Sequence, residues 1–152
     1  MVDAAIIHAL RQIAQRVESQ GIRWAVIGST NLSLQGVDVQ PRDLDIVVRL
    51  EDLDVARRAF LAENPSDVRI ITHAAGEPTH EFGLTLAGVP VQIIAEQSGG
   101  PYATKLLARR TTVIRIADIE VLGLALDAEA EAYEETGRPE KAKRIREFLN
   151  KQ

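Results

Sequence analysis

Two short stretches decide the fold of this chain: Trp24-Ala25-Val26-Ile27-Gly28-Ser29 and Asp43-Leu44-Asp45-Ile46-Val47-Val48. Residues 22–27 are apolar and rich in branched side chains, which predicts a short buried strand that runs into Gly28. Residues 29–31 are Ser, Thr and Asn, all favourable helix caps, so a helix is expected to begin there and to end at Gly36. The second stretch predicts another strand, in which apolar residues follow two acids.

Gly28 and Ser29 are suited to a phosphate ligand. The N-terminus of a helix presents unpaired backbone N–H groups and a partial positive charge, and both attract anions. A glycine lets a ligand approach the backbone closely, and a serine adds a hydroxyl group. This junction between strand and helix is therefore a candidate cradle for a triphosphate.

Asp43 and Asp45 are two residues apart in the second predicted strand. Residues at this spacing share one face of a strand, so both carboxylates project together while Leu44 and Ile46 point into a core. Neighbouring carboxylates repel each other unless a cation lies between them, and hard oxygen ligands favour Mg²⁺ or Mn²⁺. Such a pair can hold metal ions on the phosphates and on the attacking hydroxyl during an in-line displacement.

Each motif alone has a more ordinary explanation, as a helix cap or as a solvated sheet edge. The combination is more specific, and it resembles the nucleotidyltransferase superfamily related to DNA polymerase β, especially its small stand-alone bacterial and archaeal members. The matching residues are 24–29 and 42–48. The resemblance covers residues 22 to about 96 and, less closely, the C-terminal tail.

This resemblance implies a fold and an activity. The fold is an α/β (α+β) domain over residues 1–152, with a mixed sheet in a core of about 22–116 and C-terminal helices over about 117–150. The activity is metal-dependent transfer of a nucleoside monophosphate from a nucleoside triphosphate to an acceptor, with release of pyrophosphate. The family's metal-binding pair falls on Asp43 and Asp45, with Mg²⁺ or Mn²⁺ as cofactor. Its nucleotide-binding Gly-Ser falls on Gly28 and Ser29.

One position departs from the family's pattern. The family usually has a third carboxylate on a later strand, and here the expected position is Gln92. A neutral amide binds Mg²⁺ more weakly than a carboxylate and cannot accept a proton from an attacking hydroxyl. If Ala87-Gly88 forms a two-residue turn, Gly83 pairs with Gln92, and Glu81 lies diagonally from Gln92 on the same face. We hypothesise that Glu81 partly replaces the missing catalytic acid; the alternative is an exposed Glu81 without a role.

The rest of the chain alternates between helical and strand patterns. Helices are predicted over 3–20, 51–63, 102–109, 117–136 and 139–150, and strands over 43–49, 68–72, 81–86, 89–95 and 111–116. Trp24 opens an apolar strand and is predicted to pack in the core. The basic run from Arg138 to Lys151 is interpreted as a solvated helix face.

Composition limits the class of protein. The 152 residues include 45% apolar and 26% charged residues, which is ordinary globular usage. The absence of cysteine excludes disulfides, thiolate catalysis and cysteine-based metal sites. A formal net charge of −4 argues against general electrostatic binding of nucleic acid. With no export signal and no apolar stretch of membrane-spanning length, we expect a soluble, cytoplasmic protein without membrane association.

Three functions follow from these observations. The first is the metal-dependent nucleotidyltransferase, with a nucleoside triphosphate as one substrate and an acceptor that stays open among small molecules, tRNA ends and proteins. The second, motivated by Gln92, is a weakened or inactive relative that binds a nucleotide or a protein. The third is an unrelated structural domain. Some small members of the superfamily act with a small helical protein partner, so such a partner is included among the expectations.

Overall fold

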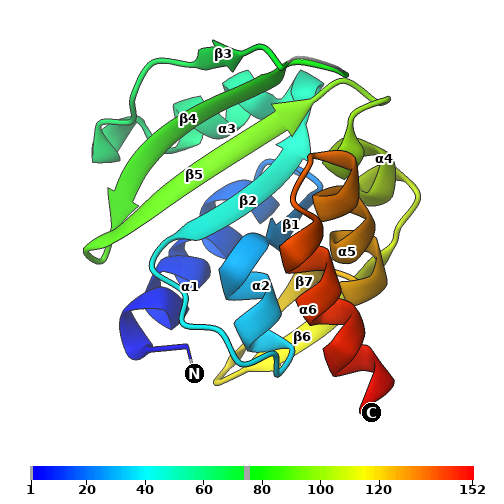
Figure 1. The fold of residues 1–152 in the computed structure, drawn as a ribbon. Coiled ribbons are helices and arrows are strands. Elements are labelled where there is room, and N and C mark those ends of the chain that lie inside the picture. Colours follow the sequence, from blue (N-terminus) through cyan, green and yellow to red (C-terminus); the bar gives the residue numbers. More distant parts are fainter. Residues whose placement is uncertain (1, 74–75) are drawn as a thin grey trace.

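The computed structural model describes residues 2–73 and 76–152. Within these residues, six α-helices accompany one seven-stranded sheet (Figure 1). The strands are β1 (Trp24–Ile27), β2 (Leu44–Arg49), β3 (Arg69–Ile71), β4 (Thr79–Leu86), β5 (Val89–Glu96), β6 (Thr111–Ile116) and β7 (Ile119–Leu124). The helices are α1 (Ala4–Glu18), α2 (Gly28–Leu34), α3 (Leu53–Ala59), α4 (Pro101–Leu107), α5 (Leu126–Glu135) and α6 (Pro139–Asn150).

The sheet is mixed, with the order β3-β4-β5-β2-β1-β7-β6. Its central strand, β2, pairs antiparallel with β1 and parallel with β5. β1 pairs parallel with β7, and the hairpins β4–β5 and β6–β7 extend the sheet on either side. The predicted α/β class with a mixed sheet is therefore confirmed.

Helices cover both faces of the sheet. Along β2, the fully buried side chains of Leu44, Ile46 and Val48 pack in one cluster with α1 and α3. Val47 points the other way and packs with α4 and α5. A smaller apolar cluster joins α2, α5 and α6 beside the sheet (Figure 1). The predicted alternation along β2 is therefore correct, and Asp45 lies on the α4–α5 face.

Two predicted helices differ from the structure. The helix expected over 51–63 is divided into a 3₁₀ turn (Leu50–Asp52), α3 and a second 3₁₀ turn (Leu61–Glu63). The helix expected over 117–136 is wrong in its first half, because residues 119–124 form β7 between β1 and β6. The turn before β7 places Ala117 at φ 52° without the glycine that usually marks such a hairpin. The C-terminal helices accordingly begin at Leu126, and the sheet extends beyond residue 116.

None of the helices in residues 2–73 and 76–152 combines the length and the apolar character needed to cross a membrane.

A buried polar contact holds α2 against β7. The side-chain amide of Asn31 is fully buried and donates to the backbone oxygen of Leu124, with 2.8 Å between nitrogen and oxygen. Gly123 leaves room for this side chain, because a Cβ atom at Gly123 would overlap Asn31 Oδ1 and lie 2.5 Å from Ile114 Cδ1. The glycine therefore allows α2 to approach β7 closely.

We expect Gly123→Ala to lower the free energy of unfolding by about 1–3 kcal/mol, because overpacking a dense core forces neighbouring side chains from their positions. Urea unfolding measures this change. Gly99→Ala is the matched control, since a Cβ atom there would lie 3.9 Å from its nearest neighbour, Glu77 Oε1. Equal stability of the two alanine variants would contradict the tight α2–β7 contact.

Candidate active site

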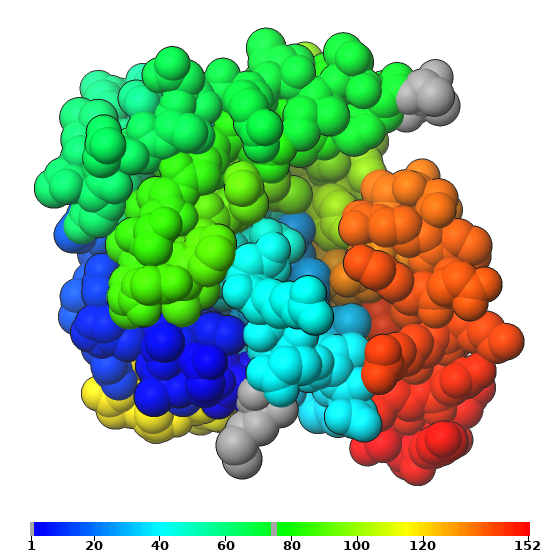
Figure 2. Space-filling view, turned by 60° about the vertical axis from the view of Figure 1, so that its left-hand side comes forward, coloured from blue at the N-terminus to red at the C-terminus, as the bar shows by residue number. Residues whose placement is uncertain are grey.

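A cleft of about 1110 Å³ opens on the α4–α5 face of the sheet. It lies where β1 ends and β2 begins, and its walls come from the β4–β5 hairpin, the start of α4 and the connection between α5 and α6. In the space-filling view, the green β4–β5 region and the orange α5–α6 region face each other across this hollow (Figure 2). The cleft therefore brings together segments from the N-terminal, middle and C-terminal parts of the chain.

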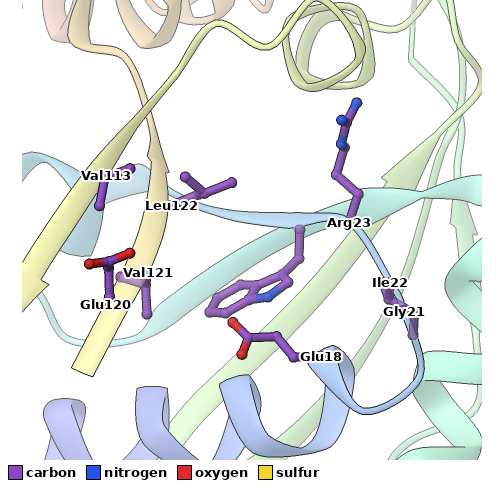
Figure 3. A pocket seen from close by; sticks show the side chains of 9 residues that line it. Glu18, Gly21, Ile22, Arg23, Val113, Glu120, Val121 and Leu122 are labelled. Atoms are coloured by element: carbon purple, nitrogen blue, oxygen red, sulfur yellow. The ribbon is translucent and has the colours of Figure 1, made fainter. Parts of the chain in front are cut away.

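A second, smaller hollow of about 450 Å³ lies at the opposite end of β1. Its charged side chains are Glu18, Arg23 and Glu120, spread around its rim without a paired set of acids (Figure 3). Trp24 lines this hollow but is only 5% exposed, which confirms the prediction that it packs in the core. The larger cleft is thus the one in which several acidic side chains lie together with basic side chains.

Asp45 lies directly over the turn between β1 and α2. In the antiparallel pairing of β1 with β2, Asp45 is opposite Ile27, the residue before Gly28. Gly28 has a φ of +74°, and a Cβ atom there would lie 2.9 Å from Asp45 Oδ2. Both the positive φ and the close carboxylate require glycine at this position. The structure therefore brings the Asp43–Asp45 segment and the Gly28–Ser29 turn to the floor of one cleft.

Burial and two neighbouring acids raise the proton affinity of Asp45. The pKa of Asp45 is raised to about 6, first by burial and then by the negative charges of Asp43 and Glu81. Arg138 and Lys141 act in the opposite direction. A carboxylate in such a position is stabilised by any cation that approaches it, because the cation offsets both effects.

Gln92 lies beside Asp45 in the parallel pairing of β2 with β5. The predicted hairpin register is confirmed, because Gly83 is opposite Gln92 and Glu81 is opposite Ile94. The missing side chain at Gly83 leaves space for the Gln92 amide, whose nitrogen would be 3.2 Å from a Cβ atom there. The Gln92 amide oxygen is buried and has no hydrogen-bond partner among the described residues. Gln92 therefore brings an unpaired amide oxygen to the strand beside Asp45.

Glu81 lines the same cleft, but it also forms an ion pair with Arg69 at its other side. The distance between Glu81 Oε1 and Arg69 Nη2 is 3.1 Å. Among residues 2–73 and 76–152, no three His, Cys, Asp or Glu side chains form a group that could hold a metal ion. Glu81 therefore adds negative charge to the cleft without completing a group of three acids with Asp43 and Asp45.

The sequence did not indicate which basic residues face the acids. Arg138 and Lys141, at the start of α6, line the cleft opposite Asp45, and we call this pair the basic wall. Both cations lie over the ring of Tyr133, at 4.8 Å and 5.5 Å from its centre, and Arg138 donates to the Tyr102 hydroxyl at 3.0 Å. Both side chains are exposed, which agrees with the predicted solvated helix face, and both also line the cleft. Only the orientation of α6 against α5 places them there.

A second residue that sequence reasoning missed is Glu129. Its side chain, in the middle of α5, is completely buried. Its carboxylate accepts a hydrogen bond from the backbone N–H of Gly28, with 2.8 Å between nitrogen and Oε1. The available signal was its spacing, since Glu129 follows Leu126 by three residues and precedes Tyr133 by four, within the buried stripe of the helix.

No family model matches the chain, and no curated protein matches its sequence. Among solved structures, it is similar to a candidate nucleotidyltransferase from Thermotoga maritima, with a TM-score of 0.76 and 26% identity. This similarity covers 100% of this chain and 97% of the other.

Two larger proteins match only in part. Terminal uridylyl transferase 4 from Trypanosoma brucei has a TM-score of 0.39 and 19% identity, over 68% of this chain and 34% of that chain. The Cid1 poly(U) polymerase has a TM-score of 0.35 and 15% identity, over 59% of this chain and 28% of that chain. The similarity to the Thermotoga maritima structure thus extends over nearly the whole length of both chains. The chain has a nucleotidyltransferase fold.

Proposed function

We propose that this protein is a nucleotidyltransferase that depends on Mg²⁺ or Mn²⁺ and uses a nucleoside triphosphate as donor. The observation that carries this proposal is the position of the Asp45 carboxylate directly over the Gly28–Ser29 turn, in a cleft that also holds Asp43. The description of the Thermotoga maritima protein as a candidate nucleotidyltransferase, over almost its whole length, supports the same activity.

The residues present fit a divalent cation. Asp43 and Asp45 supply carboxylate oxygens, and Gln92, whose amide oxygen is unpaired, is the register partner of Asp45 on β5. All three are hard oxygen donors of the kind that Mg²⁺ and Mn²⁺ prefer. When bound, the ion would supply positive charge that polarises the phosphate and offsets the repulsion between the acids.

Other residues of the cleft would bind the phosphates and accept the proton. Gly28 allows close approach to the backbone, and Ser29 offers its polar groups to a phosphate, while the basic wall supplies positive charge from the opposite side. In the reaction, an acceptor oxygen bonds to the α-phosphorus and the bond to pyrophosphate breaks. The acceptor's proton passes to a carboxylate, and we assign Glu81 to this role because it lines the cleft and its charge reaches Asp45.

Gln92 favours a second candidate function, nucleotide binding without transfer. An amide contributes no charge to a cation site and accepts no proton, so the cleft has one carboxylate fewer than the family's usual set. In this case, the protein would bind a nucleoside triphosphate in the same cleft. The acceptor, whether a small molecule, a tRNA end or a protein, would then be irrelevant to the function.

We expect Asp45→Asn to lower the rate of pyrophosphate release by at least about 100-fold, because the loss of several kcal/mol of charge stabilisation slows a reaction tenfold for each 1.4 kcal/mol. The assay uses each nucleoside triphosphate with Mg²⁺ or Mn²⁺ and a panel of acceptors. Turnover that persists at the wild-type rate in Asp45→Asn would reject the catalytic assignment. Nucleotide binding without turnover in the wild type, with turnover gained in Gln92→Asp, would favour the second function.

The same substitution is expected to stabilise the metal-free protein. Because the folded-state pKa of Asp45 is raised from 3.8 to about 6, its ionisation costs stability as pH rises between these values. Asp45→Asn should therefore raise the free energy of unfolding by about 1–3 kcal/mol at pH 8. The gain should vanish near pH 3, where the carboxyl is protonated in both states. Urea unfolding with a chelator at both pH values measures it, and a loss of stability at pH 8 would contradict the electrostatic account.

We expect Lys141→Ala to weaken the binding of a nucleoside triphosphate with Mg²⁺ by about fivefold, since a solvent-exposed ion pair contributes up to about 1 kcal/mol. Isothermal titration calorimetry at low salt measures the Kd. Lys143→Ala is the matched control, because Lys143 is on the same helix but does not line the cleft. Equal affinities of the two variants would remove the basic wall from the nucleotide site.

A further inference from the structure

We infer that Glu129 is a positioning residue that fixes the Gly28–Ser29 turn relative to the basic wall. This inference rests on the proposed function, because it assigns the turn and the wall to one ligand, the triphosphate. Glu129 itself does not line the cleft. Its effect on the ligand is therefore indirect and passes through the backbone of Gly28.

Two hydrogen bonds converge on one oxygen of Glu129. Oε1 accepts from the Gly28 backbone nitrogen at 2.8 Å and from the side-chain nitrogen of Asn31 at 3.0 Å. Both donors belong to the first turn of α2, so the carboxylate holds this turn at two points. The other oxygen, Oε2, is buried and has no partner among the described residues. Both hydrogen bonds that the Glu129 side chain accepts thus come from the first turn of α2.

The second donor is itself held in place. Asn31 also donates to the Leu124 backbone oxygen, and the side chain of Gln35 donates both to this oxygen and to Asn31 Oδ1. Gly123 closes the remaining space around Asn31. Because Asn31 has little freedom to move, the bond from Glu129 ties α5 to a rigid point rather than to a flexible side chain.

The same helix carries the other side of the cleft. Tyr133 follows Glu129 by about one helical turn, and its ring lies beneath both cations of the basic wall. α5 therefore contacts the nucleotide turn through one residue and supports the wall through another. One turn of this helix therefore separates the residue that contacts the Gly28–Ser29 turn from the residue that supports the basic wall, and the hydrogen bond from Gly28 N–H to Glu129 fixes the turn to the helix.

Burial raises the pKa of Glu129 to about 7, although its bonds to Asn31 and Gly28 act to lower it. At neutral pH the side chain is therefore present in both protonation states, and Oε1 accepts hydrogen bonds in each. A glutamine has the same shape and keeps the acceptor oxygen, so Glu129→Gln preserves the geometry. Glu129→Met has a similar volume but removes the acceptor.

Two measurements on these variants test the inference. The first is hydrogen exchange of the Gly28 backbone amide, followed by NMR in the protein without nucleotide. The second is the Kd for each nucleoside triphosphate with Mg²⁺. We expect Glu129→Met to accelerate the exchange and to raise the Kd, each by about tenfold, since the N–H group of Gly28 loses its acceptor. Glu129→Gln should stay within about threefold of the wild type on both, as an acceptor of the same geometry remains.

A matched control separates positioning from general stability. Ala132→Gly lies in the same helix, is also fully buried and removes no hydrogen-bonding group. It should lower the melting temperature while leaving the nucleotide Kd and the Gly28 exchange at the wild-type value under native conditions. If Glu129→Met does not fold, Glu129→Asp takes its place, because its shorter side chain brings the acceptor out of reach of Gly28.

Each possible result either supports or overturns the inference. Exchange at Gly28 that is the same in Glu129→Met and in Ala132→Gly would overturn it, and so would a Glu129→Gln variant as defective as Glu129→Met. If the wild type binds no nucleotide, the proposed function fails, and the exchange measurement alone then decides whether Glu129 holds the turn. The inference is supported if exchange at Gly28 is faster and the nucleotide Kd is higher in Glu129→Met, while both values in Glu129→Gln stay close to those of the wild type.

Discussion

The closeness of the Asp45 carboxylate to Gly28 is the constraint on which the rest of the site depends. Asp45 Oδ2 occupies space that any side chain at position 28 would need. Burial and two neighbouring acids hold the carboxyl at a raised pKa, so the arrangement is unfavourable without a positive charge. A protein that only required stability would not keep such a group here. This cost is the physical reason to regard the cleft as a binding site.

The fold supplies this arrangement through long-range contacts. β1 and β2 pair so that the acids meet the turn, and β5 adds Gln92 from the other side of β2. The C-terminal helices then close the cleft with the basic wall and hold the turn from behind through Glu129. The acids and the basic wall thus come from parts of the chain that are more than 90 residues apart in the sequence (Figure 1).

Local patterns were sufficient to predict the centre of the site. Alternation placed Asp45 on the face opposite Leu44 and Ile46, and the two-residue turn predicted the Gly83–Gln92 pair; the structure confirms both. β7 was missed, because its apolar run fits a helix or a strand equally well and its turn has no glycine at Ala117. Glu129 and the basic wall depend on how α5 and α6 pack, which no local pattern contains. The roles of Asp43, Asp45, Glu81, Gly28 and Ser29 stay predictions.

In the function that we propose, a divalent cation links the acidic pair to a triphosphate on the Gly28–Ser29 turn. The most direct measurement is electron paramagnetic resonance of Mn²⁺ titrated into the wild-type protein and into Asp43→Asn/Asp45→Asn, each with a non-hydrolysable nucleoside triphosphate. We expect protein-bound Mn²⁺ that requires the nucleotide and is lost in the double variant. Mn²⁺ bound equally by both proteins, or by neither, would contradict it.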